Sequence, residues 1–224
     1  MSMKYAGFAL LLLALGWTAC NNGVKKEKWE NGTIKSELCY EGDLLNGMCK
    51  WYYQNGNPQV QANYVNNKLE GSLMRWHENG TISEECWYKN GVRDSVRRSY
   101  SIKGVLISEE YYTNGKLNGD LKKWHDNGKV FMEGQYVDGM MDGSWMIFYE
   151  DGNLSSTANY VMGKGTQTGY DESGYKCMTV SYENNVKQGK ETRYGPDGKV
   201  VATLYYDHGR PVDSFDFIEK QAEP

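Results

Sequence analysis

The chain has 224 residues, with 25 basic and 29 acidic side chains and a formal net charge of −4. An aromatic content of 13% is too high for a disordered chain. The acidic balance lacks the excess of basic charge with which nucleic-acid-binding proteins neutralise phosphates, so we expect no nucleic-acid partner. Glycine is frequent, at 26 residues, and proline is rare, at 4, which favours many short strands joined by tight turns.

The first 19 residues predict an export signal. Lys4 supplies a charged start, and the apolar run over residues 6–15 is too short to cross a membrane as a helix. The sequence Thr18-Ala19-Cys20 resembles the cleavage site of bacterial lipoproteins, in which the cysteine carries the lipid. The resemblance implies a lipid anchor at Cys20, a tether over residues 20–27, and a place in the bacterial cell envelope, on the periplasmic side of the outer membrane. The alternative is an ordinary secretory signal followed by an incidental cysteine.

A repeat of 22–24 residues fills residues 28–211. In every copy a glycine is followed eight residues later by a tyrosine, and an aromatic residue stands four positions before seven of the glycines. One copy is two residues shorter than the others, and the missing residues lie between Tyr160 and Gly165. The glycines are Gly32, Gly56, Gly80, Gly104, Gly128, Gly152, Gly174 and Gly198, and the tyrosines are Tyr40, Tyr64, Tyr88, Tyr112, Tyr136, Tyr160, Tyr182 and Tyr206.

Asn or Asp precedes six of the eight glycines, which is typical of hairpin turns. Directly opposed residues share a face of a sheet. A three-residue loop such as Glu78-Asn79-Gly80 would place Trp76 opposite Ile82, with both aromatic rows on one buried face. The sequence therefore predicts an all-β fold: a single extended antiparallel sheet or solenoid of eight hairpins, about sixteen strands, with longer loops between repeats. Residues 212–224 form a cap or tail, and the shortened repeat, beside Lys176, predicts a kink or soft point.

Two segments carry a family resemblance. They are Asn114-Gly115-Lys116-Leu117-Asn118-Gly119 and Asp138-Gly139-Met140-Met141-Asp142-Gly143. Both resemble the MORN repeat (membrane occupation and recognition nexus), in its second, bacterial variant, and the resemblance covers residues 28–211. It implies membership of a YwqK-type antitoxin family, and hence a toxin as the protein partner. A repeat motif of this kind indicates the fold more strongly than the function.

Few residues are candidates for chemistry. Cys39 and Cys49 flank one loop on adjacent predicted strands, so the spacing allows a disulfide between them; the alternative is two free thiols. His77 and His125 occupy the same repeat position, roughly 19 Å apart, which is too far to share a metal ion. No catalytic or phosphate-binding motif occurs in the sequence. We expect no enzymatic activity, no metal and no cofactor.

The position three residues before the turn glycine carries a ring in five repeats: Trp29, Tyr53, His77, His125 and Tyr149. One interpretation is an exposed row that recognises a partner, because aromatic side chains are enriched at interfaces. The other is cross-strand packing that stiffens the sheet. The function we expect is a lipid-anchored scaffold that binds a protein partner; the alternative is a structural envelope lipoprotein that binds lipid or glycan.

Overall fold

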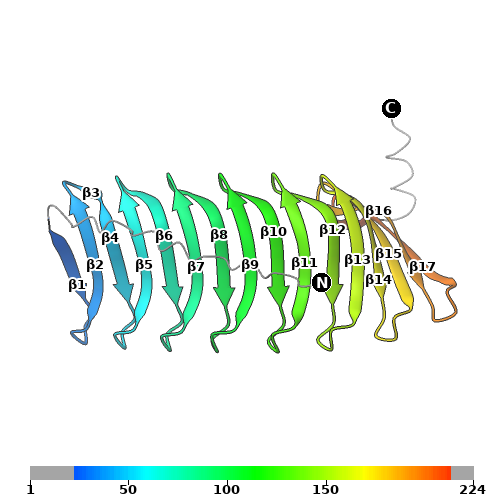
Figure 1. Cartoon of the computed structure of the whole chain (residues 1–224), viewed down its shortest axis with the longest axis horizontal. Helices are drawn as coiled ribbons and strands as arrows, with labels where there is room; N and C mark the ends of the chain where they lie inside the picture. The colour runs from blue at the N-terminus through cyan, green and yellow to red at the C-terminus, as the bar shows by residue number, and fades with distance from the viewer. Residues whose placement is uncertain (1–22, 213–224) are drawn as a thin grey trace, which may run out of the picture.

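The computed structural model describes residues 23–212, which form one open antiparallel sheet without a helix (Figure 1). The single extended sheet predicted from the repeats is confirmed. Its 18 strands are β1 (Val24–Lys28), β2 (Ile34–Glu41), β3 (Leu44–Leu45), β4 (Gly47–Tyr52), β5 (Pro58–Val65), β6 (Lys68–Trp76), β7 (Ile82–Lys89), β8 (Val92–Tyr100), β9 (Leu106–Thr113), β10 (Lys116–Trp124), β11 (Val130–Val137), β12 (Met140–Phe148), β13 (Leu154–Val161), β14 (Lys164–Tyr170), β15 (Lys176–Glu183), β16 (Val186–Tyr194), β17 (Val200–Asp207) and β18 (Arg210–Val212).

Sixteen of these strands form the eight predicted hairpins, and the short strands β3 and β18 are additional. The sheet begins earlier than predicted, because Val24 already pairs with Cys39. Residues 24–27 therefore belong to β1 and not to a tether. The export signal over residues 1–19, the lipid attachment at Cys20 and the tail from residue 213 onward lie outside the described residues.

The predicted three-residue turns are present in all eight hairpins. In the third, the backbone N–H of His77 donates to the carbonyl of Thr81 over 2.8 Å, and the N–H of Gly80 donates back to His77 over 2.9 Å. Trp76 pairs with Ile82, as the side-chain pattern required. Gly80 has a φ of 89°, which explains why glycine ends each loop.

Replacing a turn glycine by valine should destabilise the sheet through backbone strain alone. Gly128 has a φ of +81°, and a Cβ built on it would meet no atom within 4 Å. We expect Gly128→Val to lower the free energy of unfolding by about 1–3 kcal/mol, measured by denaturant titration. Gly128→Asn is the control, because asparagine tolerates this conformation better. Equal losses for the two variants would show that the left-handed backbone is not the cause.

The connections between repeats differ from the longer loops that we predicted. They are two-residue turns: Lys89 pairs with Val92, and between them Asn90 and Gly91 have φ values of 52° and 84°. Positive φ at both positions is the type I′ turn, whose twist matches that of the strands. The same two-residue spacing joins every repeat to the next. The Asn-Gly signals at these positions belong to a second set of hairpin turns.

A bulge follows most of these turns and explains the small residue seven positions after the tyrosine. Ser95 has a φ of 68°, and the register shifts between Cys86 and Tyr88 beside it. In the short repeat Tyr160 pairs directly with Gly165 and no shift occurs. The two residues that this repeat lacks are therefore those of the bulge. They would follow Gly165 and do not lie between Tyr160 and Gly165 as we predicted, because Tyr88 and Arg93 of a full-length repeat pair over the same spacing.

The two aromatic rows lie on opposite faces of the sheet, contrary to our prediction of one buried face. Tyr100, from the row before the glycines, donates its hydroxyl to Glu85 over 3.0 Å. Tyr88, from the row after them, pairs opposite Arg93, which contacts the neighbouring Glu84 at 3.6 Å. Glu84 and Glu85 are adjacent residues of β7, and adjacent residues of a strand point to opposite faces. The rows that contact them therefore lie on opposite faces. A register shift beside each three-residue turn, as between Arg75 and Trp76, separates the rows and was not anticipated.

We call the face that carries Tyr88 and its equivalents the inner face. Its buried apolar residues are Cys49, Ala62, Leu73, Cys86, Leu121, Trp145, Tyr160 and Val180. They form two separate apolar clusters, one around Leu73 and the other around Trp145.

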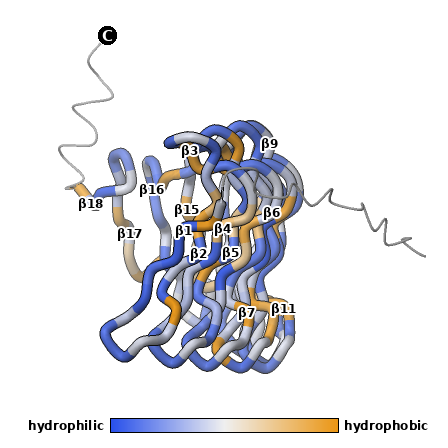
Figure 2. The backbone as a smooth tube through the Cα atoms, turned by 90° about the vertical axis from the view of Figure 1, so that its left-hand side faces the viewer, coloured by the Kyte–Doolittle hydropathy of each residue, from blue (hydrophilic) through white to orange (hydrophobic). Residues whose placement is uncertain are grey.

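The sheet bends after β13, at the short repeat. Strands β14 to β17 leave the regular row in Figure 1, and β16 to β18 stand beside the stacked hairpins in Figure 2. Asn185, in the turn after β15, reaches back across the short hairpin. Its side chain accepts from the N–H of Met141 and donates to the carbonyl of Gly139, both over 2.8 Å. The predicted kink is therefore present, and hydrogen bonds brace it instead of leaving it soft.

Candidate functional site

The five rings before the turn glycines connect consecutive hairpins. Each directs its polar atom to a backbone carbonyl of the next repeat: Tyr53 donates to Trp76 over 2.8 Å, for example, and His77 lies 3.0 Å from the carbonyl of Tyr100. All five side chains are half-buried. The remaining contacts are Trp29 to Tyr52 at 3.1 Å, His125 to Phe148 at 2.9 Å and Tyr149 to Tyr170 at 2.7 Å. This arrangement favours the structural interpretation of the row over the recognition interpretation.

Removing two of these hydroxyl groups should cost stability. Tyr53→Phe with Tyr149→Phe leaves the rings in place but loses both hydrogen bonds to the next hairpin. We expect the free energy of unfolding to fall by about 1 kcal/mol for each bond, measured by denaturant titration. Tyr175→Phe is the control, because that side chain is 63% exposed. If the double variant and the control unfold alike, the rings do not tie the repeats together.

The disulfide considered between Cys39 and Cys49 is not formed. Cys49 is a free thiol with no exposed surface, and it pairs opposite Ala62 in the inner core. It stands two residues after the bulge at Gly47, which has a φ of 100° and changes the alternation of side chains that the sequence interpretation assumed. Burial raises the pKa of the Cys49 thiol, so it is held in the protonated form.

Charged residues interrupt the inner face in the middle of the sheet. Arg97 stands two residues after the bulge residue of its repeat, where the neighbouring repeats have the buried Leu73 and Leu121. Arg93 likewise occupies a position that is leucine in both neighbouring repeats. These two departures from the repeat pattern are visible in the sequence, and they mark the site.

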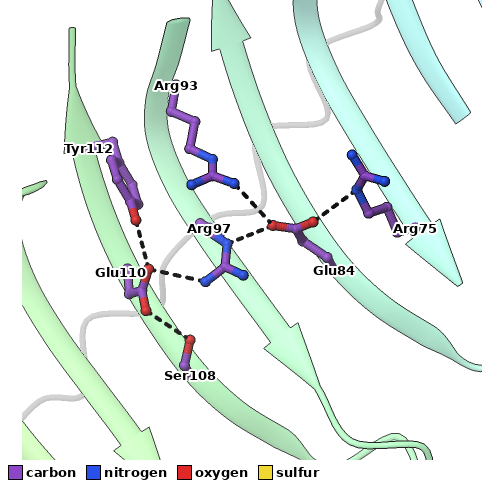
Figure 3. Close-up of polar contacts among 7 residues, drawn as sticks. All are labelled: Arg75, Glu84, Arg93, Arg97, Ser108, Glu110 and Tyr112. Carbon is purple, nitrogen blue, oxygen red and sulfur yellow. Dashed lines mark hydrogen bonds and ion pairs between the residues drawn. The ribbon is translucent and has the colours of Figure 1, made fainter. Parts of the chain in front are cut away.

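The substituted residues form one network, which we call the arginine cluster (Figure 3). Arg97 bridges two carboxylates, with Nε 2.6 Å from Glu84 and Nη1 3.2 Å from Glu110. Glu84 also contacts Arg75 at 3.1 Å and Arg93 at 3.6 Å. The cluster comprises Arg75, Glu84, Arg93, Arg97 and Glu110, and Tyr112 and Ser108 donate hydroxyl groups to Glu110 over 2.8 and 3.3 Å.

The two signs of charge lie at different depths in the arginine cluster. The Glu84 and Glu110 side chains are only 13% and 12% exposed, whereas Arg75 and Arg93 are 48% and 39% exposed. Burial alone would raise the pKa of Glu110, but the Tyr112 hydroxyl and Arg97 outweigh it and lower that pKa. Three guanidinium groups against two ionised carboxylates leave one net positive charge. A molecule that approaches this face therefore meets guanidinium groups.

Counting residues from the turn glycine along each predicted strand places Arg97 opposite Glu109. This register is wrong by one residue, because Arg97 pairs with Glu110. The structure pairs Glu109 with Arg98 instead, with Nε of Arg98 2.6 Å from the carboxylate. Arg98 lies on the outer face. The same face carries a row of glutamates five residues after four of the turn glycines, a pattern that is most often a solvated surface: Glu37, Glu85, Glu109 and Glu133. The row contacts cations or tyrosines: Glu37 with Lys26, Glu85 with Tyr100 and Glu133 with Lys122.

This arrangement of charged and apolar side chains on the inner face suits the binding of a partner. An apolar cluster lies on either side of the arginine cluster, and Arg97 joins the carboxylates in fixed ion pairs. Within residues 23–212, no three His, Cys, Asp or Glu side chains are grouped to hold a metal ion. In the same part of the chain, no helix has the length and apolar character needed to cross a membrane.

The repeat matches a known family of sequence repeats. The sequence model for a MORN repeat variant matches residues 21–41, 45–66, 117–138, 141–162 and 187–208. No curated protein matches the chain. The matched segments each contain one three-residue turn and most of the hairpin around it. Repeats of this kind are generally protein- or membrane-binding modules. The five matches and the array of hairpins together identify the chain as a MORN-repeat protein.

Proposed function

We propose that the protein is a non-enzymatic scaffold that binds a protein partner on its inner face. The observation that carries this proposal is the arginine cluster between two apolar clusters, on a sheet face that no second layer of the described chain covers. Arginine and aromatic side chains, such as Trp51 and Trp145 in the flanking clusters, dominate the binding energy of many protein interfaces.

The lipoprotein-like sequence at Thr18-Ala19-Cys20 supports anchoring of this scaffold in the bacterial cell envelope, on the periplasmic side of the outer membrane. The resemblance to the antitoxin family supports a toxin as the partner, so the anchored protein would act as an immunity protein. The partner should be sought by affinity purification of the full chain from solubilised envelope, followed by mass spectrometry. One stoichiometric protein supports the scaffold. Recovery of lipid or glycan alone would instead favour a structural envelope lipoprotein.

Anchoring predicts a separate result for Cys20→Ala. Each buried CH2 of a lipid chain contributes roughly 0.8 kcal/mol to membrane binding, so losing the acyl chains should release the protein from the bilayer. We expect the variant to move from the membrane fraction to the soluble fraction, or to remain unprocessed at higher mass on a gel. Cys177→Ala, at a free thiol, is the matched control. Wild-type fractionation and mobility of Cys20→Ala would exclude the anchor.

A further inference from the structure

A second group of charges on the inner face has the same design as the arginine cluster. Glu191 has no exposed side-chain surface, and it contacts Lys187 Nζ at 2.8 Å and Arg193 Nε at 2.9 Å. The two cations remain 32% and 54% exposed. We call Lys187, Glu191 and Arg193 the C-terminal cation site. Here too a buried carboxylate fixes cations that reach solvent, and two cations against one carboxylate leave one net positive charge.

The two charged groups occupy equivalent places in the repeat. Glu191 corresponds to Arg97, and Lys187 corresponds to Arg93; each pair is separated by 94 residues, or four repeats. Arg97 lies on β8 and Glu191 on β16, eight strands farther along the sheet. At about 4.8 Å between strands, the two sites are roughly 38 Å apart along the sheet.

The inner face between the two sites is largely apolar, although it also carries Lys123 and the hydrogen-bonded pair Ser156 and Gln167. Leu121, Trp145 and Tyr160 form its buried core, with Met132 and Met141 packed against them. The inner face therefore presents a cation site, an apolar stretch and a second cation site in that order. This pattern stands out on a protein whose net charge is −4.

We infer that the inner face binds an extended protein segment that carries an acidic group at each end of an apolar stretch. The inference rests on the proposed scaffold function and names the chemistry of its partner. The acidic groups of the segment would lie on the guanidinium and ammonium groups that remain exposed, and its apolar residues would cover the cluster around Trp145. Complementary charges of this kind select the partner and fix its register.

Two synthetic peptides test the inference, because the natural partner is unidentified. One carries glutamates at both ends of an alternating apolar and polar centre of about 12 residues, which spans roughly 38 Å when extended. The other has lysine in place of each glutamate. Binding to the detergent-solubilised full chain is measured by fluorescence anisotropy at low and high salt. We expect the glutamate peptide to bind at least about tenfold more tightly, and salt to reduce this preference.

Two graft variants remove the buried carboxylates and the cations fixed to them without leaving unpaired buried charge; the half-exposed Arg75 is retained. The first, Glu84→Val, Arg93→Leu, Arg97→Leu and Glu110→Ala, introduces residues that earlier repeats have in these positions, and it leaves the net charge unchanged. The residues copied are Val60, Leu69, Leu73 and Ala62. The second is Lys187→Leu, Glu191→Leu and Arg193→Ser. Arg98→Met is the control, since methionine holds that outer-face position in two other repeats. Circular dichroism and thermal unfolding confirm that each variant is folded.

We expect each graft to weaken binding of the glutamate peptide at least about tenfold, and the control to leave it unchanged. The inference is overturned if wild-type protein does not discriminate between the peptides, or if folded graft variants bind like wild type. It is also overturned if Arg98→Met weakens binding as much as the grafts do. If the grafts still capture the envelope partner that wild type captures, the protein remains a scaffold for that partner, but the inner face is not where the partner binds and the inference of an acidic segment fails.

Discussion

Replacing Arg97 alone by leucine is expected to lower the free energy of unfolding by about 3 kcal/mol, although leucine is the residue that neighbouring repeats have there. The substitution removes the cation that bridges Glu84 and Glu110, whose side chains are only 13% and 12% exposed. An ion left buried without its partner retains the cost of desolvation. The expected loss is at the lower end of the about 3–5 kcal/mol that breaking a buried ion pair costs, because the Arg97 side chain is itself 24% exposed. Chemical denaturation followed by circular dichroism measures it.

The four-residue graft over the arginine cluster should reverse this loss. Replacing a whole buried ion network by well-packed apolar residues is often neutral or stabilising. We therefore expect the graft variant, which contains Arg97→Leu, to be at least as stable as wild type. If Arg97→Leu alone unfolds like wild type, the ion pairs that it removes do not contribute to stability.

The pH dependence of the free energy of unfolding tests the same network in a second way. Despite the burial that raises it, the pKa of Glu110 is lowered below the usual 4.5 by Tyr112 and Arg97. The unfolded state therefore takes up a proton first as the pH falls, so the contribution of Glu110 is present above pH 4.5 and is lost below it. Wild type should lose stability below pH 4.5 more steeply than the graft variant. Parallel pH profiles would contradict this assignment.

Trp145→Ala is expected to lower the free energy of unfolding by about 3–5 kcal/mol. The indole is only 6% exposed, lies edge-on to Tyr136 with ring centroids 5.0 Å apart, and belongs to the cluster that also contains Leu121. It packs directly over Gly134 on the neighbouring strand, where an added Cβ would lie 2.2 Å from Cδ2 of the ring. Gly134→Ala should therefore displace the indole and cost about 1–3 kcal/mol in thermal or chemical unfolding.

A double-mutant cycle tests whether these two residues act through one contact. In the Trp145→Ala background the ring is absent, so Gly134→Ala should then cost almost nothing. The coupling between the two changes should approach the whole cost of Gly134→Ala in the wild-type background. Additive losses would mean that the ring does not rest on Gly134. Gly169→Ala is the comparison, at another strand glycine without a left-handed backbone, where an added Cβ would meet no atom closer than 3.4 Å.

The hairpins and their three-residue turns could be predicted because one local rule repeats eight times. The turn glycine needs a positive φ, and the opposed pair such as Trp76 and Ile82 sets the loop length. The arrangement of the two faces could not be predicted in the same way. A bulge inserts residues without changing the repeat length, so the alternation of side chains counted along the sequence fails at residues such as Cys49.

The candidate site was hidden for the same reason. With the register off by one residue, Arg97 appeared opposite Glu109 instead of bridging Glu84 and Glu110. The five rings were found by their periodicity, but periodicity alone does not show whether a ring faces a partner or the next repeat. The hydrogen bonds from Tyr53 and its equivalents depend on the stacking of hairpins, which is a tertiary property.

The bend at the short repeat holds the two parts of the sheet at a fixed angle to each other. Two residues are absent beside Gly165, and Asn185 fastens the turns on either side of the gap through Gly139 and Met141. The arginine cluster lies before this bend and the C-terminal cation site lies after it. A deletion or insertion of two residues beside one turn can therefore change the angle between the two parts of a binding surface while every contact residue stays the same. Arrays of this kind can diverge in shape by small insertions and deletions before they diverge in surface chemistry.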